Sequence, residues 1–210
     1  MKTNFLGMIK LGLILAAFAA AACVMLAFVY SGTSEVIAQR QKTDLDAALK
    51  ELFPDADKFE KIDGITSPDN TVAVEESYAA YKNGKITGAA LRVSRASYNG
   101  QIKSMVGVSA DGFITGVKIL EHSDTPGLGA NAASSSYFVD RAKGITFYGQ
   151  FAGKKITDPH IVKSDVIAIT ASTITSRAVS ASVKAAGLAV HAWLTGEDAD
   201  AVTSASGEEE

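Results

Sequence analysis

Residues 11–30 contain no charged side chain, and this run constrains the fold more than any other feature of the chain. At 1.5 Å rise per residue, a helix of this length matches the hydrocarbon thickness of a bilayer. A cleaved signal peptide would have a shorter apolar core, of about 7–15 residues. Cys23 would be the lipid-bearing residue of a lipoprotein, but a further apolar run follows it, so we interpret it as a small apolar residue of the span. We therefore predict an uncleaved transmembrane helix in contact with membrane lipid.

The basic residues near this run lie on one side of it. Lys2 and Lys10 precede the span, whereas the flank at 31–35 contains no base. By the positive-inside tendency, the N-terminus is then cytoplasmic. We predict a single-pass protein of the cell inner or plasma membrane, with its C-terminal domain on the outer (periplasmic or extracellular) face.

The chain after the span changes character several times. Residues 34–53 have leucines at three- and four-residue spacing, which predicts an amphipathic helix that Ser34 caps and Pro54 ends. The last stretch contains six acidic residues and no base, a composition typical of disorder. We divide the chain into a cytoplasmic stub and transmembrane anchor (1–33), an amphipathic connector helix and linker (34–70), a main domain (71–195) and an acidic tail (196–210).

The main domain begins with a β pattern that three turn dipeptides divide. Asn83-Gly84, Asn99-Gly100 and Asp111-Gly112 favour tight hairpins, because both central residues of such turns need positive φ. They separate four strand-like runs, and glycines inside these runs indicate bulges or close approach of another group. An apolar stripe predicts a helix over 173–193. The predicted fold class is α+β: an antiparallel β-meander packed with helices, preceded by one N-terminal transmembrane helix.

Composition and missing motifs exclude several classes of function. The formal net charge of −3 gives no concentrated basic face, so we expect no nucleic-acid partner. The single cysteine cannot form an internal disulfide or hold an iron–sulfur cluster, and no haem-attachment, hydrolase, zinc-protease or P-loop motif is present. The three histidines have no partners at metal-ligand spacing, so we expect no metal site. If the protein carries electrons, flavin is the cofactor that remains.

Five hydroxyl side chains fall within seven positions just before the predicted helix. Capping a helix needs only one of them. A helix start also presents free N–H groups and partial positive charge, and hydroxyls add donors, so the cluster suits a phosphate group better than capping alone. A helix cap with spare serines remains the alternative. The five are Thr170, Ser172, Thr173, Thr175 and Ser176.

The run T-A-S-T-I-T-S at 170–176 resembles the flavinylation motif of the FMN-binding domain family. That resemblance implies covalent FMN, joined through its phosphate to the Thr173 side-chain oxygen, with Thr170, Ser172, Thr175 and Ser176 as further cofactor-binding residues. Ala171 stands where the family has glycine, and Ile167 where many members carry aspartate. Alanine can replace that glycine only where the backbone does not require positive φ.

A second stretch carries the same resemblance. D-T-P-G-L-G at 124–129 is similar to the family's E-T-P-G-L-G, and it precedes the hydroxyl cluster by some 45 residues. The resemblance implies that this loop approaches the flavin. We expect Thr125, Gly127, Leu128 and Gly129 as cofactor-binding residues, with Leu128 against the ring. For the aromatic residues Phe138, Phe147, Tyr148 and Phe151, we expect core positions for all but one.

The resemblance is strongest to the G subunits of Rnf-type ion-translocating ferredoxin:NAD oxidoreductase complexes. It implies a membrane flavoprotein, modified by a phosphoester-threonyl-FMN, that relays electrons in an ion-transport translocase and has no catalytic residue of its own. The implied partners are the other subunits of a membrane redox complex, including a second flavin-bearing membrane subunit, and a flavin transferase for maturation. The alternatives are the C-type flavin subunit of a sodium-pumping NADH:quinone reductase, a stand-alone anchored flavoprotein, and a non-flavinylated adaptor.

Overall fold

The computed structural model describes residues 5–196. The first four residues of the predicted stub lie outside the described residues, as does the predicted acidic tail except for Gly196. Residues up to Asp44 form one unit, and the residues from Leu45 onward form a second, compact unit. Residues 45–70, which the sequence pattern assigns to a connector and linker, therefore belong to the compact unit.

Helix α1 runs without interruption over Phe5–Leu52, where the sequence pattern suggested an anchor followed by a separately capped helix. The polar residues at the expected boundary do not break it. The Thr33 hydroxyl donates to the Val29 carbonyl at 2.8 Å, and the Ser34 hydroxyl donates to the Ser31 carbonyl at 3.4 Å. A hydroxyl that bonds back to its own helix does not cap a new one. The helix ends two residues before Pro54, as predicted.

The first part of α1 has the properties of a membrane anchor. An 18-residue window reaches a mean hydropathy of 2.6, and none of that window is buried in the protein. Large side chains such as Phe18 and Phe28 are 73% and 78% exposed. A helix of this length with an apolar surface all round suits the interior of a bilayer.

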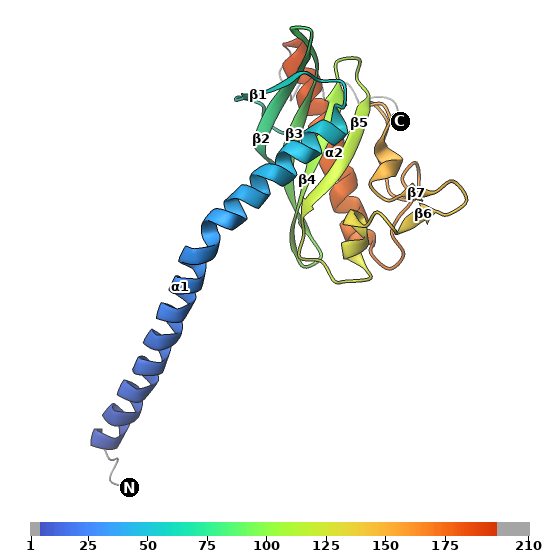
Figure 1. Ribbon diagram of the computed structural model, residues 1–210. Helices are drawn as coiled ribbons and strands as arrows, with labels where there is room; N and C mark the ends of the chain where they lie inside the picture. Colours follow the sequence, from blue (N-terminus) through green and yellow to red (C-terminus); the bar gives the residue numbers. More distant parts are fainter. Residues whose placement is uncertain (1–4, 197–210) are drawn as a thin grey trace. The chain divides into compact units, whose positions relative to one another are not determined.

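Five antiparallel strands form one sheet in the order β1-β2-β3-β4-β5, which confirms the predicted meander (Figure 1). One of the three predicted hairpin turns has the expected backbone, with Asn83 at φ 50° and Gly84 at φ 75°. In the other two only the glycine has positive φ, with Gly100 at φ 118° and Gly112 at φ 79°. The edge strand β1 was not predicted, because its sequence Lys-Phe-Glu-Lys-Ile is short and largely charged. The strands are β1 (Lys58–Ile62), β2 (Val72–Lys82), β3 (Lys85–Ser97), β4 (Gly100–Ser109) and β5 (Ile114–Glu121).

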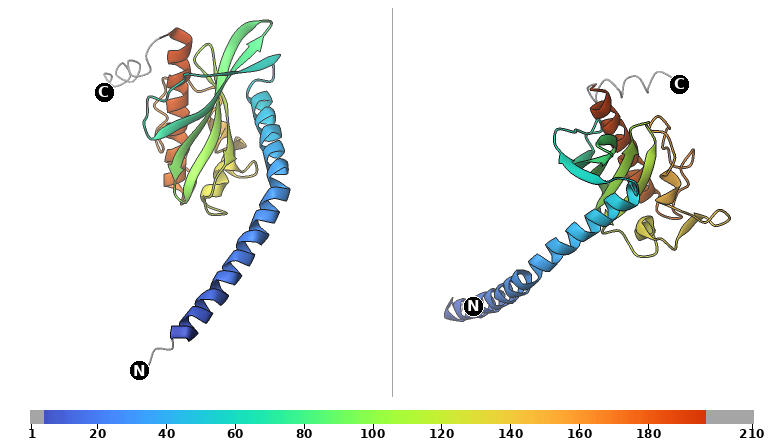
Figure 2. Two further views of the ribbon diagram at one scale, coloured as in Figure 1. Left: turned by 90° about the vertical axis from the view of Figure 1, so that its left-hand side faces the viewer. Right: turned by 45° about the horizontal axis from the view of Figure 1, so that its top comes forward.

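The sheet lies between two helices. Helix α2 (Thr173–Thr195) packs on one face, where it closes the larger core with inward residues such as Leu91, Val106 and Val179. The last turns of α1, from Leu45, pack on the other face with Phe53, beside residues such as Ala90 and Met105 (Figure 2). The C-terminus of α2 is closed by Gly196, which adopts φ 74° and donates to the Ala192 carbonyl at 2.9 Å.

Three glycines inside strands allow the end of α1 and Phe53 to pack closely against the sheet. A Cβ at Gly88 would overlap the Val108 carbonyl and approach the Phe53 ring to 2.8 Å. A Cβ at Gly107 would lie 3.0 Å from Leu52, and one at Gly116 would lie 2.9 Å from Leu52. These glycines therefore mark close approach of a neighbouring helix, which is one of the two readings that their position inside strands allowed.

The chain between β5 and α2 crosses one end of this assembly in short elements. Phe147 and Phe151 are fully buried and pack edge to face with ring centroids 5.7 Å apart. Tyr148 is partly buried against the same core, and Phe138 is 40% exposed. The elements are η1 (Gly129–Ala133), β6 (Phe138–Asp140), β7 (Ile145–Thr146) and η2 (Gly149–Phe151).

Candidate functional site

A pocket of about 430 Å³ opens where three segments meet. The β3–β4 hairpin contributes Tyr98, the loop after β5 contributes one wall, and the start of α2 contributes the other. Pockets of this size accommodate cofactors and other small molecules. The lining residues are Tyr98, Asp124, Thr125, Leu128, Gly129, Ala171, Ser172, Thr173, Ile174 and Thr175.

The start of α2 presents unused hydrogen-bond donors to this pocket. The first helical hydrogen bond runs from the Ser176 N–H to the Ser172 carbonyl at 3.0 Å, so the amides of residues 173–175 have no acceptor within the helix. Ser172 occupies the N-cap position, yet its side chain makes no capping bond, and its buried hydroxyl has no hydrogen-bond partner among the described residues. Capping therefore does not account for Ser172. Free amides and a spare hydroxyl are the donors that a phosphate group needs.

Two of the five hydroxyl residues have other surroundings. Ser176 is fully buried, and its Oγ accepts from the Ile169 N–H at 3.0 Å and donates to the Ser172 carbonyl at 2.9 Å. It fixes the turn that leads into α2. Thr170 is exposed, and its N–H donates to the Tyr137 hydroxyl at 3.3 Å. Neither residue is among the described residues that line the pocket.

The loop after β5 is shaped by a tight turn over Thr125–Leu128. The Leu128 N–H donates to the Thr125 carbonyl at 3.1 Å, with Pro126 and Gly127 at the two central positions. Gly127 has φ 76°, which a turn of this type requires at its third residue and which glycine adopts without strain. The turn directs Leu128, 41% exposed, to the pocket, whereas Gly127 itself lies outside the lining that the described residues form.

Asp124 joins this loop to the hairpin and to α2. Its Oδ2 accepts from the Ser97 hydroxyl at 2.6 Å and from the Thr175 hydroxyl at 2.8 Å, and its Oδ1 accepts from the Asn99 N–H at 3.0 Å. Gly129 lies so close that a Cβ there would be 2.6 Å from Thr175 Oγ1 and 2.7 Å from Asp124 Cβ. The three segments that form the pocket are thus tied together at a single carboxylate.

The hydrogen bonds also fix the charge state of Asp124. Burial on its own would raise the pKa of this carboxyl. The bonds from Ser97, Asn99 and Thr175, together with the nearby charge of His122, outweigh that effect and hold the pKa below its usual value. Asp124 is therefore a carboxylate at neutral pH.

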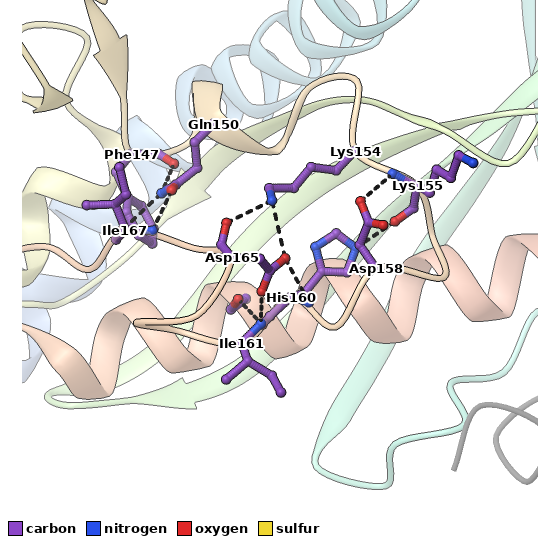
Figure 3. A network of polar contacts seen from close by, with 10 residues as sticks. Phe147, Gln150, Lys154, Lys155, Asp158, His160, Ile161, Asp165 and Ile167 are labelled. Atoms are coloured by element: carbon purple, nitrogen blue, oxygen red, sulfur yellow. Dashed lines mark hydrogen bonds and ion pairs between the residues drawn. The ribbon is translucent and has the colours of Figure 1, made fainter. Parts of the chain in front are cut away.

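The loop that leads from η2 to the hydroxyl cluster is held by side-chain hydrogen bonds and an ion pair (Figure 3). The Asp165 carboxylate accepts from the Ile161 N–H at 2.6 Å, from the His160 N–H at 3.1 Å and from the Lys154 ammonium at 3.2 Å. Burial would raise the pKa of Asp165, but the Ile161 N–H and the Lys154 ammonium keep it below its usual value. Asp165 therefore stabilises the fold above the ordinary carboxyl range, and this stabilisation is lost as pH falls through the lowered pKa.

Gln150 holds the same loop through a second set of hydrogen bonds. Its side-chain oxygen accepts from the Ile167 N–H at 2.7 Å, and its side-chain nitrogen donates to the Ile167 carbonyl at 3.1 Å and to the Phe147 carbonyl at 2.9 Å (Figure 3). A side-chain amide that pairs with both backbone groups of one residue replaces a strand neighbour. The segment that enters the hydroxyl cluster is therefore held to η2 and the core.

Ala171 lies in a left-handed backbone conformation, with φ 60°. We expected alanine here only if the backbone did not require positive φ, yet Ala171 occupies a position where φ is positive. Cβ makes this conformation unfavourable by about 1 kcal/mol for a residue other than glycine. The turn keeps it because the Ser172 N–H donates to the Ile169 carbonyl at 3.0 Å and Ser176 bonds both sides of the turn.

We expect Ala171→Gly to stabilise the chain by roughly 0.5–1 kcal/mol, because relief of the left-handed strain exceeds the added freedom of the unfolded state. Thermal unfolding of the full chain in detergent would show a midpoint about 2–4 °C higher. Ala152→Gly is the matched control: Ala152 is also exposed but has φ −60°, so the same change there should destabilise. Equal effects at both positions would contradict this account.

The structure brings together six of the nine residues that the sequence motifs singled out, and it adds four. Thr125, Leu128, Gly129, Ser172, Thr173 and Thr175 line one pocket, whereas Gly127, Thr170 and Ser176 are not part of the lining that the described residues form. The added lining residues are Tyr98, Asp124, Ala171 and Ile174. Asp124, Ala171 and Ile174 lie within the two motifs, so the motifs could have supplied them. Tyr98 belongs to the β3–β4 hairpin, and only the folded structure shows that this hairpin lies beside the pocket.

Comparison with known proteins agrees with these features. The FMN-binding domain family matches residues 97–187, and the RnfG N-terminal region matches residues 1–52. The chain is 35% identical over 168 residues to the G subunit of the proton-translocating ferredoxin:NAD(+) oxidoreductase complex of Clostridium ljungdahlii, an alignment that covers 78% of this chain and 80% of that protein. It is 32% identical over 197 residues to the G subunit of the Na(+)-translocating complex of Acetobacterium woodii, with 83% and 87% covered. The crystal structure of Shewanella oneidensis NqrC matches with a TM-score of 0.46 and 17% identity, over 69% of this chain and 74% of that one.

An apolar N-terminal helix, an antiparallel sheet, and a pocket at a hydroxyl-rich helix start define a membrane-anchored protein of the FMN-binding domain class. Within that class, the identities and coverage are decisive. The chain belongs to the RnfG family, the G subunits of ion-translocating oxidoreductase complexes.

Proposed function

We propose that this chain is the membrane-anchored electron-transfer subunit of an Rnf-type ion-translocating ferredoxin:NAD oxidoreductase, and that it carries FMN esterified to Thr173. The observation that carries the proposal is the start of α2, where Thr173 lines a pocket beside backbone amides and a buried hydroxyl that have no hydrogen-bond partner in the part of the chain that the structure describes. Membership of the RnfG family supports the place of the chain in a membrane redox complex.

The residues of the pocket fit a phosphate and a flat apolar ring. Thr173 is half-buried at the first position of α2, so its hydroxyl is supported by the helix and still reachable. The helix dipole and free amides favour an anionic phosphodiester at that end. Leu128, Ile174 and Tyr98 provide exposed apolar surface around the pocket, with exposures of 41%, 53% and 70%.

Attachment of the flavin needs only the Thr173 hydroxyl from this chain. With FAD as donor, a phosphoester bond forms between Thr173 Oγ1 and the FMN phosphorus, and the pyrophosphate bond of FAD breaks. AMP leaves, and the hydroxyl proton is released to a base or to solvent. A separate Mg²⁺-dependent flavin transferase would provide the catalytic groups, so this chain acts as its substrate.

Bound FMN supplies the electron chemistry, because it accepts and donates electrons one at a time. The residues of this chain hold it: the start of α2 retains the phosphate, and the 124–129 loop contacts the ring. We place the domain on the outer face of the membrane, where a covalent bond prevents loss of the cofactor. The partners are the neighbouring redox subunits of the complex, among them a second flavin-bearing membrane subunit.

Intact-mass measurement on the full chain, produced with its flavin transferase and purified in detergent, tests this proposal. Under denaturing conditions, we expect a mass higher than that of the polypeptide by one FMN less one water. The denatured chain should also show flavin fluorescence on a gel. A chain of unmodified mass from cells with an active transferase would overturn the proposal and favour a non-flavinylated adaptor.

A further inference from the structure

Asp124 is a charged residue in the wall of the pocket to which the proposed function assigns no role. Its side chain is 5% exposed, and it lines the same pocket as Thr173. Of the described residues that form this lining, Asp124 alone carries a charge at neutral pH. A group that occupies the pocket therefore meets one fixed negative charge from the protein.

No cation neutralises this charge directly. Among the described residues, Asp124 makes no ion pair, and its three partners are the neutral donors Ser97, Asn99 and Thr175. His122 is the nearby titratable group that acts on it from the same loop, and Tyr98, which lies between its partners Ser97 and Asn99 in the chain, lines the same pocket. Neutral donors hold the carboxylate in place and leave its charge uncancelled, so its field extends into the pocket.

We propose that the Asp124 carboxylate sets the reduction potential of the FMN and holds it more negative than a neutral residue would. The inference rests on the proposed function, since it requires flavin in this pocket. Reduction adds one electron to the flavin, and that added negative charge is less favourable beside a fixed carboxylate in a partly buried site. Charge placed near the ring is one of the means by which a protein tunes a flavin.

The surroundings of Asp124 allow its charge to be removed without loss of its contacts. In Asp124→Asn, the amide oxygen can accept from the Asn99 N–H. The amide nitrogen then faces Ser97 and Thr175, whose hydroxyls can accept as well as donate. Ser97→Ala is the complementary variant, because it removes the 2.6 Å hydrogen bond and leaves the carboxylate charged. The two variants separate charge from positioning.

The experiment is spectroelectrochemical titration of the full chain, loaded with flavin and purified in detergent, after flavin content has been measured on denatured protein. We expect Asp124→Asn to shift the one-electron equilibrium toward reduced flavin by about tenfold, which is about 59 mV in the positive direction. Ser97→Ala should stay close to the wild-type potential. Because the pKa of Asp124 lies below its usual value, the difference between wild type and Asp124→Asn should be constant between about pH 6 and 8.

An Asp124→Asn protein with the wild-type potential would overturn the inference, and so would equal shifts in both variants, since these would indicate positioning alone. If the Asn variant fails to load flavin, Asp124→Ser provides the neutral residue for the same comparison, with the same expected sign. A wild-type chain without flavin would refute the proposed function itself. That result is distinguishable, because the flavin content is measured before any titration.

Discussion

Thr173→Ala is expected to abolish covalent flavin entirely, because the ester has no other oxygen to form on at that position. Thr173 is the first residue of α2 and lies in the pocket at the helix amides that precede the first helical hydrogen bond. The neighbouring hydroxyls suggest redundancy, but their surroundings differ. Ser176 is committed to two hydrogen bonds, Thr175 donates to Asp124, and Thr170 lies outside the described lining. The Ser172 hydroxyl has no hydrogen-bond partner among the described residues, but at 5% exposure it is less accessible to a transferase than the half-buried Thr173. Intact mass should therefore return the unmodified chain, with no transfer to a neighbouring residue.

The stability of this variant should change little. Alanine is a good helix former, and Thr173 makes no side-chain hydrogen bond among the described residues, so we expect a change within about 1 kcal/mol in the free energy of unfolding. Thr173→Val keeps the shape of threonine without its hydroxyl and should also lose the flavin. The matched control is Thr195→Ala, the same substitution at the far end of the same helix, which should keep it. Full flavin content in Thr173→Ala would exclude Thr173 as the attachment residue.

Periodicity and turn chemistry were sufficient to predict most of the fold. The hairpin dipeptides fixed four strands and their antiparallel order, and the apolar stripe fixed α2, because these signals depend on neighbouring residues alone. The edge strand β1 was not predicted, because its short and largely charged sequence has no continuous apolar face. The expected helix start at Ser34 was wrong for a related reason: a hydroxyl that caps and a hydroxyl that bonds back to its own helix look alike in sequence.

The candidate site was predictable only where it lies within single motifs. The 124–129 loop and the hydroxyl cluster can be recognised separately, but neither indicates that Asp124 bonds to Thr175, 51 residues away. Tyr98 could not be assigned either, since nothing in its hairpin distinguishes it from any exposed turn residue. The sequence could say what a positive φ at Ala171 would imply, but not whether φ is positive. That backbone angle is set by hydrogen bonds of Ile169, Ser172 and Ser176 on both sides of the residue.

Gly129→Ala tests whether contact between the two motifs maintains the pocket. Gly129 is buried and does not need positive φ, so its backbone would accept alanine. The added Cβ, however, would lie 2.6 Å from Thr175 Oγ1 and 2.8 Å from Asp124 Oδ2. Both side chains are buried and cannot rotate into solvent, so the Asp124–Thr175 hydrogen bond must open. We expect a cost of about 1–3 kcal/mol in the free energy of unfolding and a large loss of flavin content at full transferase activity.

The chain offers a matched control for this result at Gly149. A Cβ there would lie 2.7 Å from Thr146 Oγ1, so Gly149→Ala also crowds a threonine hydroxyl, but at an exposed position outside the pocket that the described residues form. It should lower the unfolding temperature and leave flavin content unchanged. Combining Gly129→Ala with Thr175→Ala removes the closest contact and should recover part of the stability. A Gly129→Ala chain that carried full flavin and unfolded like the wild type would refute the coupling of the two motifs through Asp124. The 124–129 loop and α2 would then be able to move apart by more than these distances allow.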